Sequence, residues 1–295
     1  MVKTALVTDS SAYLPPALMQ KHRVQVIPLY IHFGAESLRD GVELTTAEFY
    51  DRLARADTLP TTSQPSVGDF LELYRRLGQD AEAIVSIHIS SGLSGTVPSA
   101  LGARQVLSAE AAEAGVDPPT IHVVDSTLTS AGLGLLVTAA ARAIEAGQPA
   151  QAVVRTVEEL IPRMRVIFVV DTLEYLQKGG RIGGAAALLG SMLQVKPILH
   201  LTGGRIDVLE KVRTARKAKQ RLLGIMEEQV GQAGAVHAAV IHANAPPEAE
   251  MLRQQVADRF QCRELFVCEL SPAIATHVGP GAVGVAFYAE AQATV

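Results

Sequence analysis

The feature that most constrains the fold is the alternation of strand and helix patterns in the first half of the chain. Apolar runs at 4–8, 82–89 and 120–125 predict strands, and Ala-rich segments at 97–113 and 129–146 predict the helices that follow the last two. A chain that alternates strands with helices builds a parallel sheet covered by helices on both faces. We therefore expect an α/β fold.

The sequence changes in character near residue 165. A strand pattern at 165–170 is followed later by the turn TGG at 202–204, which lies between two extended segments and is typical of a β-hairpin. We predict two closely packed domains. The N-terminal parallel-sheet α/β domain covers residues 1–163, and the C-terminal α/β domain, with a mixed sheet, covers residues 164–295.

Composition excludes several classes of function. Hydrophobic residues make up 48% of the 295 residues, which suits a globular protein, and the net charge of −4 gives no general attraction to nucleic acid or anionic membranes. Polar residues and Pro197 interrupt the longest apolar-rich run, at 185–201, whereas a membrane span needs about 20 continuous apolar residues. The first residues lack the pattern of a signal peptide. We expect a cytoplasmic protein with no nucleic-acid partner and no stable membrane insertion.

The sequence predicts neither a metal nor a nucleotide cofactor. Its 8 histidines show no H-E-x-x-H spacing, and its 2 cysteines are too few for a zinc site. The phosphate-binding pattern G-x-x-x-x-G-K-[ST] is also missing from the chain. We therefore expect no bound cofactor, and no ATP site on this chain.

Four segments rich in serine and threonine share one context. Three follow predicted strands and the other precedes a predicted helix; they are TDSS at 8–11, TTSQPS at 61–66, SSGLSGT at 90–96 and DSTLTS at 125–130. In open α/β sheets, ligands bind at the carboxyl ends of the strands, where helix N-termini attract anions. Serine, threonine and aspartate are also common in caps and turns. Four such segments at one sheet edge nevertheless favour an anion-binding crevice.

Ser94 raises the alternative of a serine esterase. It lies in GLSGT, which differs from the hydrolase pattern G-x-S-x-G because the second glycine comes one residue early. A nucleophilic serine also needs a histidine and an acid, for which His277 and either Asp9 or Asp125 are the candidates. The residues alone leave open an esterase using Ser94 and His277 and a binding module for a small anion, and the aliphatic composition also allows a slot for a flexible apolar ligand.

The ordered motifs TDSS, TTSQPS, SSGLSGT, VVDSTLTSAG, LEYLQKGGRIG, KPIL and HVGPGAVG, which span residues 8 to 284, closely resemble those of the DegV family of bacterial fatty-acid-binding proteins. That family includes the acyl-binding subunit of bacterial fatty acid kinase, which serves phospholipid metabolism. The resemblance implies two α/β domains with the acyl chain buried between them. It also implies a lipid-binding subunit, not an enzyme, whose partners are a long-chain fatty acid and a separate kinase.

The resemblance assigns roles to six residues. Thr62, Ser63, Ser94 and His277 would bind the fatty-acid carboxylate, and Lys178 and Arg181 would dock the kinase. Burying about fifteen methylenes gains roughly 12 kcal/mol at about 0.8 kcal/mol each. The carboxylate must then find hydrogen-bond partners inside, because an unpaired buried charge is very costly. Three hydroxyls and a histidine suit that task.

Overall fold

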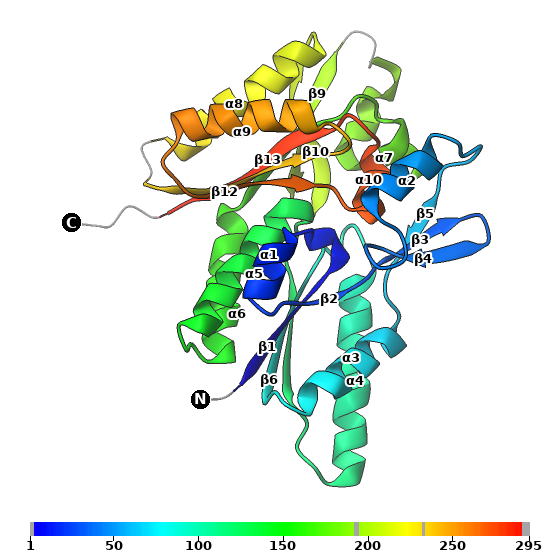
Figure 1. Cartoon of the computed structure of the whole chain (residues 1–295), viewed down its shortest axis with the longest axis vertical. Helices are drawn as coiled ribbons and strands as arrows, with labels where there is room; N and C mark the ends of the chain where they lie inside the picture. The colour runs from blue at the N-terminus through cyan, green and yellow to red at the C-terminus, as the bar shows by residue number, and fades with distance from the viewer. Residues whose placement is uncertain (1–2, 192–194, 232–233, 291–295) are drawn as a thin grey trace.

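The computed structural model describes residues 3–191, 195–231 and 234–290, and within them the chain forms two large sheets and one small sheet (Figure 1). The first sheet has four parallel strands in the order β2-β1-β6-β7. Its strands are β1 (Thr4–Asp9), β2 (Gln25–Ile27), β6 (Ala83–His88) and β7 (Thr120–Asp125). The parallel sheet predicted from the alternating patterns is confirmed.

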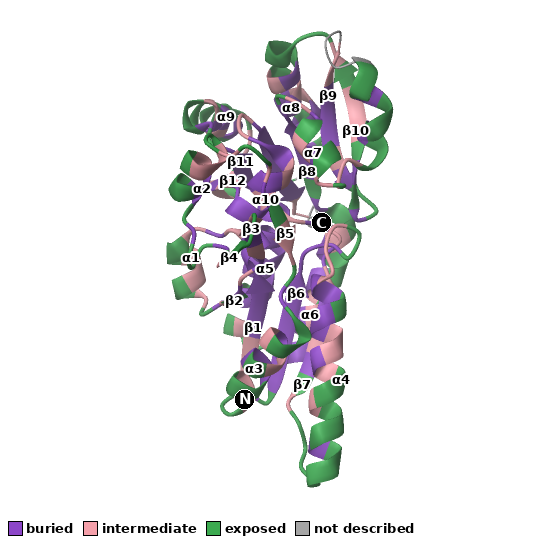
Figure 2. Ribbon diagram, turned by 90° about the vertical axis from the view of Figure 1, so that its right-hand side faces the viewer, coloured by how far each residue is buried: buried purple, intermediate pink, exposed green. Residues whose placement is uncertain are grey.

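Both faces of the parallel sheet are covered by helices because successive strand residues point to opposite sides. Val7 and Ile84 face a core shared with α3 (Val67–Gly78) and α4 (Thr96–Ala114). Leu6 and Val85 belong to a larger core that includes α5 (Ser130–Glu145) and α6 (Ala150–Leu160). Every residue of β6 is buried (Figure 2), which explains why its apolar residues do not alternate with exposed polar ones.

The second sheet is mixed, with the order β10-β9-β8-β13-β11-β12. Only the β11–β12 pair is parallel among its described strands. The strands are β8 (Arg165–Val169), β9 (Lys196–Thr202), β10 (Arg205–Val212), β11 (Val236–His242), β12 (Cys262–Glu269) and β13 (Val283–Ala289). The predicted TGG turn joins β9 to β10 as an antiparallel hairpin, with positive φ at Gly203 and Gly204.

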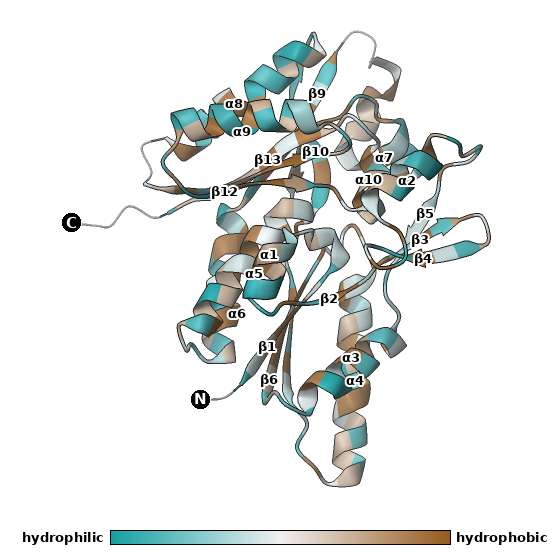
Figure 3. Ribbon diagram, in the orientation of Figure 1, coloured by the Kyte–Doolittle hydropathy of each residue, from teal (hydrophilic) through white to brown (hydrophobic). Residues whose placement is uncertain are grey.

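One core joins the two large sheets. Helices α8 (Ala215–Val230) and α9 (Pro246–Arg259) cover the outer face of the mixed sheet, and Figure 3 shows hydrophilic residues along them. The inner face contributes Val166, Phe168 and Ile241 to the same core as Leu6 and Val85. Helix α5 lies between the sheets and is buried almost throughout, because it packs on β1 from one side and on β11 and β13 from the other.

A small antiparallel sheet, β4-β3-β5, flanks this core. Its strands are β3 (Tyr30–Phe33), β4 (Glu36–Arg39) and β5 (Thr61–Ser63), and α2 (Thr46–Leu53) separates β4 from β5. The short helix α10 (Pro272–Val278) packs against β3 and β5. Residues from the N-terminal and C-terminal halves of the chain therefore meet at β5 and α10.

The chain passes from the parallel sheet to the mixed sheet between Arg163, which ends the turn η2 (Ile161–Arg163), and Arg165, which begins β8. The remaining elements are η1 (Ser10–Ala12), α1 (Pro16–Lys21), α7 (Glu174–Lys178) and η3 (Gly183–Ser191). Within the described ranges, no helix has the length and apolar character needed to cross a bilayer.

Candidate functional site

A largely apolar cavity of about 780 Å³, counted with its mouth, lies between the mixed sheet and the loops that follow β5, β6 and β7. Its apolar walls come from β8, β9, β10, β11, α7 and α10 and include Val166, Phe168, Leu201 and Ile241. Its polar lining consists of Thr62, Ser63, Gln64, Ser94, Thr129, Ser130, Arg181 and His277.

The four residues predicted to bind a carboxylate all line this cavity. Thr62 and Ser63 belong to β5, Ser94 lies in the loop between β6 and α4, and His277 belongs to α10. The fold brings them together because α10 packs on β5 beside the carboxyl end of the parallel sheet. Three separate parts of the chain thus contribute polar side chains to one cavity.

His277 is held neutral in this cavity. Burial, assisted by the positive charge of Arg181, lowers the pKa of His277 to about 4. Its Nε2 atom lies 2.8 Å from Thr62 Oγ1, whereas its Nδ1 atom has no hydrogen-bond partner among the described residues. When Thr62 donates to Nε2, the ring proton sits on Nδ1 and provides a free donor for an acceptor such as a carboxylate oxygen.

Ser63 and Ser94 are oriented by neighbouring polar side chains. Ser63 Oγ lies 2.8 Å from His32 Nε2, and Ser94 Oγ lies 2.9 Å from Thr96 Oγ1. Each hydroxyl keeps hydrogen-bonding capacity for a ligand, because a hydroxyl has one donor and two acceptor sites.

Thr129 and Ser130, from the predicted crevice segment DSTLTS, also line the cavity, although neither was predicted individually to bind the carboxylate. The Oγ atoms of both residues are buried and have no hydrogen-bond partner within the described residues. Thr129 precedes the first turn of α5 without capping it, and Ser130 has a left-handed φ of 54°. Unsatisfied buried hydroxyls in a cavity wall indicate that a polar ligand or water completes them. The sequence feature that points to these two residues is the segment DSTLTS, because they are its last two residues.

Arg181 and Lys178, the residues predicted to dock a partner, have different surroundings. Arg181 is half-buried and lines the cavity, donating from Nε to the Leu93 carbonyl at 3.1 Å and from Nη1 to the Gly179 carbonyl at 2.7 Å. Lys178 is exposed and pairs with Glu174 at 2.6 Å. Arg181 therefore places a positive charge beside His277 and the loop that carries Ser94, while Lys178 remains at the surface.

A second, more polar depression reaches the same residues from outside. It is lined by residues 56–62, Lys178, Gly179, Arg181, Thr276 and His277. Thr62, Arg181 and His277 line both spaces, so they form the partition between the apolar cavity and the solvent side.

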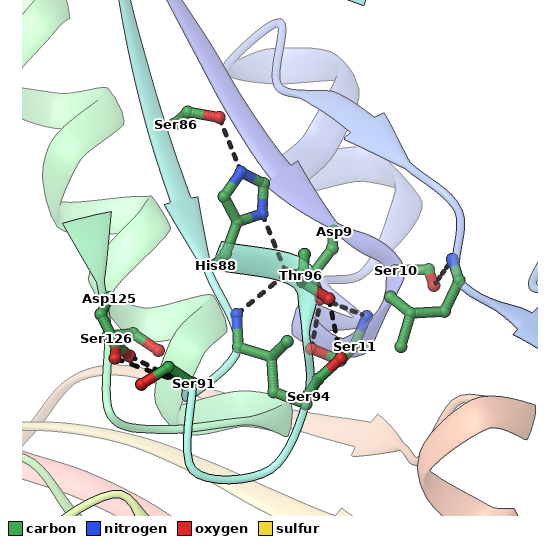
Figure 4. A network of polar contacts seen from close by, with 12 residues as sticks. Asp9, Ser10, Ser11, Ser86, His88, Ser91, Ser94, Thr96, Asp125 and Ser126 are labelled. Carbon is green, nitrogen blue, oxygen red and sulfur yellow. Dashed lines mark hydrogen bonds and ion pairs between the residues drawn. The ribbon is translucent and has the colours of Figure 1, made fainter. Parts of the chain in front are cut away.

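The expectation that all four hydroxyl segments converge on one crevice is wrong for TDSS. Asp9 is fully buried and accepts hydrogen bonds from the Ile89 amide at 2.9 Å, from His88 Nδ1 at 3.0 Å and from Ser11 (Figure 4). His88 Nε2 in turn lies 2.6 Å from Ser86 Oγ. A buried carboxylate needs such partners, and this network fixes the start of the loop that carries Ser94.

The arrangement does not form the catalytic triad of a serine esterase. Ser94 hydrogen-bonds Thr96, while His277 bonds Thr62 and has no acid at Nδ1 among the described residues. The two candidate acids are used elsewhere: Asp9 bonds His88, and Asp125 accepts from the Ser91 and Thr127 amides. A triad requires the histidine to contact both the serine and the acid.

The sequence is similar to those of known proteins over nearly its whole length. Residues 3–290 match the family model described as "Uncharacterised protein, DegV family". A DegV domain-containing protein of Streptomyces coelicolor is 42% identical over 283 residues, which cover 95% of this chain and 96% of that protein.

Solved structures are similar over nearly the whole chain. A DegV family protein from Thermus thermophilus, described by its fatty acid binding, has a TM-score of 0.90 and 36% identity, with 98% of this chain and 100% of that one covered. DegV from Bacillus subtilis, described as a fatty acid binding protein, has a TM-score of 0.88 and 35% identity with the same coverage. This chain belongs to the DegV family.

Proposed function

We propose that this chain binds a long-chain fatty acid in the cavity between its two domains, 1–163 and 164–295, and presents the carboxylate to a separate kinase. One observation carries the proposal: an apolar cavity ends in a cluster of buried polar groups, three of which have no partner in the described chain. These are Thr129 Oγ1, Ser130 Oγ and His277 Nδ1. The fatty acid binding of two similar DegV proteins supports the same assignment.

The two ends of a fatty acid match the two kinds of lining. The acyl chain gains about 0.8 kcal/mol for each methylene that leaves water for the apolar walls. The carboxylate needs donors, and each hydrogen bond to it is worth about 1.5–3 kcal/mol. Ser63 and Ser94 supply hydroxyl donors, and neutral His277, oriented by the Thr62 hydroxyl, supplies a ring N–H. A small polar anion would leave most of the cavity wall unused.

The proposed kinase step requires that a partner protein can reach the carboxylate of the bound fatty acid. Thr62, Arg181 and His277 separate the cavity from the outer depression, so a carboxylate held by them is reachable by a partner protein. The chain carries no phosphate-binding loop of its own, and phosphoryl transfer from ATP to the carboxylate is therefore assigned to the partner. Exposed Lys178 and half-buried Arg181 lie at the outer depression and are the proposed contacts.

Lipid extraction from the purified protein tests fatty-acid binding. We expect mass spectrometry to recover fatty acid in near-equimolar amount, and we expect delipidated protein to rebind a fluorescent long-chain analogue. Recovery of no fatty acid together with no rebinding would refute the proposal. The kinase step has its own test, in which bound fatty acid, ATP and a fatty acid kinase catalytic subunit are incubated and acyl phosphate is trapped with hydroxylamine. Rebinding without acyl phosphate would refute the kinase step alone.

A further inference from the structure

A second cavity lies beside the end of β1, between α1 and the loop that joins β4 to α2. Its volume is about 950 Å³ counted with its mouth. Among the described residues, it shares no lining residue with the cavity proposed to hold the fatty acid. Part of its lining is the TDSS segment, which the proposed fatty-acid site does not use. The second cavity is therefore a separate space from the first one.

The rim of the second cavity is apolar and partly exposed. Val42 and Val26 are 63% and 38% exposed, although both are large hydrophobic residues, and Met19, Pro16 and Pro28 continue the same wall. Exposed hydrophobic residues gathered at the mouth of a cavity indicate a surface that an apolar group covers. The occupant of this rim therefore carries an apolar stem.

The floor of the cavity holds two buried acceptors without partners. Asp40 is 2% exposed, and its Oδ2 atom accepts from Ser10 Oγ at 2.7 Å. Ser271 and the Ala273 amide approach the carboxyl, but Oδ1 has no hydrogen bond of good geometry in the described chain. Thr8 is 1% exposed, and its Oγ1 likewise lacks a partner there. Buried polar atoms are nearly always paired, so Asp40 Oδ1 calls for a donor, and Thr8 Oγ1 calls for a hydrogen-bond partner and can accept from the same donor group.

The charged groups in the lining favour a positively charged ligand over a negatively charged one. The lining contains the carboxyls of Asp9 and Asp40 and no Lys, Arg or His. Asp9 is already satisfied by His88, Ile89 and Ser11, so Asp40 is the carboxyl with free capacity. Burial raises the pKa of Asp40 to about 7, against the opposing effect of its hydrogen bonds. A nearby cation would favour the ionised carboxylate, and an anion would be repelled.

We propose that the second cavity binds an alkylammonium group, with the ammonium at Asp40 and Thr8 and the aliphatic stem along Val26 and Val42. An ammonium has three donors and no acceptor, which matches a floor of unpaired acceptor oxygens. Its stem can lie on apolar surface while the charged end reaches a polar group. Either a free amine or the lysine side chain of a partner protein presents this chemistry.

Titrations monitored by ¹H–¹⁵N NMR test the proposal on the full chain in its lipid-bound form. The probes are n-butylammonium, its neutral analogue 1-butanol and the anion butyrate, all at fixed ionic strength. We expect n-butylammonium to shift the amides of Thr8, Asp40 and Val42 and to bind at least tenfold more tightly than the other two. Asp40→Asn should weaken n-butylammonium binding at least tenfold, and Thr8→Val should weaken it severalfold. Asp117→Asn, the same change at an exposed residue near the end of α4, should leave it unchanged.

Three results would overturn the ammonium site. They are no saturable n-butylammonium binding, equal binding of 1-butanol, and an equal loss in Asp117→Asn, which would indicate general charge attraction only. If Asp40→Asn does not fold, the probe comparison on the unmodified chain and Thr8→Val decide the question. Nα-acetyl-lysine N-methylamide identifies the source of the group. Binding of this compound supports a partner's lysine, and binding of n-butylammonium alone supports a free amine.

Discussion

Thr62 Oγ1 and His277 Nε2 lie 2.8 Å apart although 215 positions separate the two residues in the chain. Thr62 comes from the small sheet after α2, and His277 comes from α10 near the C-terminus. The hydrogen bond lies in the polar lining of the apolar cavity and sets which ring nitrogen of His277 is left without a partner among the described residues. The polar end of the cavity therefore depends on both halves of the chain.

Thr62→Val tests this hydrogen bond directly. Valine keeps the shape of threonine but removes the hydroxyl, so His277 loses the partner that holds its ring proton on Nδ1, the atom proposed to donate to the carboxylate. We expect fatty-acid affinity to fall roughly tenfold to a hundredfold, because a hydrogen bond to a charged group is worth about 1.5–3 kcal/mol. Titration with a fluorescent fatty acid measures the change. Thr61→Val, at the exposed neighbour in the same strand, is the matched control, and equal losses in the two variants would contradict the role of Thr62.

Ser94→Ala should also weaken fatty-acid binding, by roughly tenfold, while the protein remains folded. Ser94 lines the cavity and bonds Thr96, and its removal leaves the buried Asp9 network behind the loop intact. Ser108→Ala on the exposed side of α4 serves as the control. Retained affinity in Ser94→Ala, with circular dichroism showing an unchanged fold, would remove Ser94 from the site.

The parts of this structure that depend on local pattern were predictable, and the parts that depend on distant partners were not. The strands β1, β6 and β7 are rich in apolar residues and alternate with helix patterns, so their parallel sheet followed from the sequence. Strand β5 has only three residues, and it forms because β3 pairs with it. Asp9 is held by His88, which lies 79 positions away in the chain, and a contact this distant cannot be recognised from the sequence. The segment TDSS was therefore predicted to line the anion-binding crevice. The unpaired state of Ser130 is likewise a property of tertiary packing.

The pKa of His277 predicts a dependence of stability on pH. Burial lowers this pKa from 6.5 to about 4, so the folded protein holds the neutral form while the unfolded chain takes up a proton below pH 6.5. The stabilisation is present above pH 6.5 and is lost as the pH falls towards 4, by about 3 kcal/mol in total. Urea unfolding at pH 7 and pH 5 measures it, and His277→Gln should show a smaller loss between the two values. Asp40 has a raised pKa and acts in the opposite direction, which is why the variant comparison is required.

Gly179 leaves the space that His277 occupies. A Cβ atom at residue 179 would lie 2.1 Å from His277 Nδ1, closer than any side chain permits. We expect Gly179→Ala to displace the imidazole and to lower both fatty-acid affinity and stability, the latter by roughly 1–3 kcal/mol. Gly190→Ala is the control, because a Cβ there meets nothing within 4 Å. Wild-type binding by Gly179→Ala would show that His277 does not contact the carboxylate.

Lys178 and Arg181 separate kinase docking from lipid binding. Lys178 is exposed, so Lys178→Ala should leave fatty-acid affinity unchanged and should lower the rate of acyl-phosphate formation if the partner docks there. Arg181 lines the cavity and donates to Leu93 in the loop that carries Ser94, so Arg181→Ala should lower that rate and also weaken fatty-acid binding severalfold. Both quantities are measured on each variant, with Lys217→Ala on the exposed face of α8 as the control. A normal acyl-phosphate rate in Lys178→Ala would place the kinase contact away from α7.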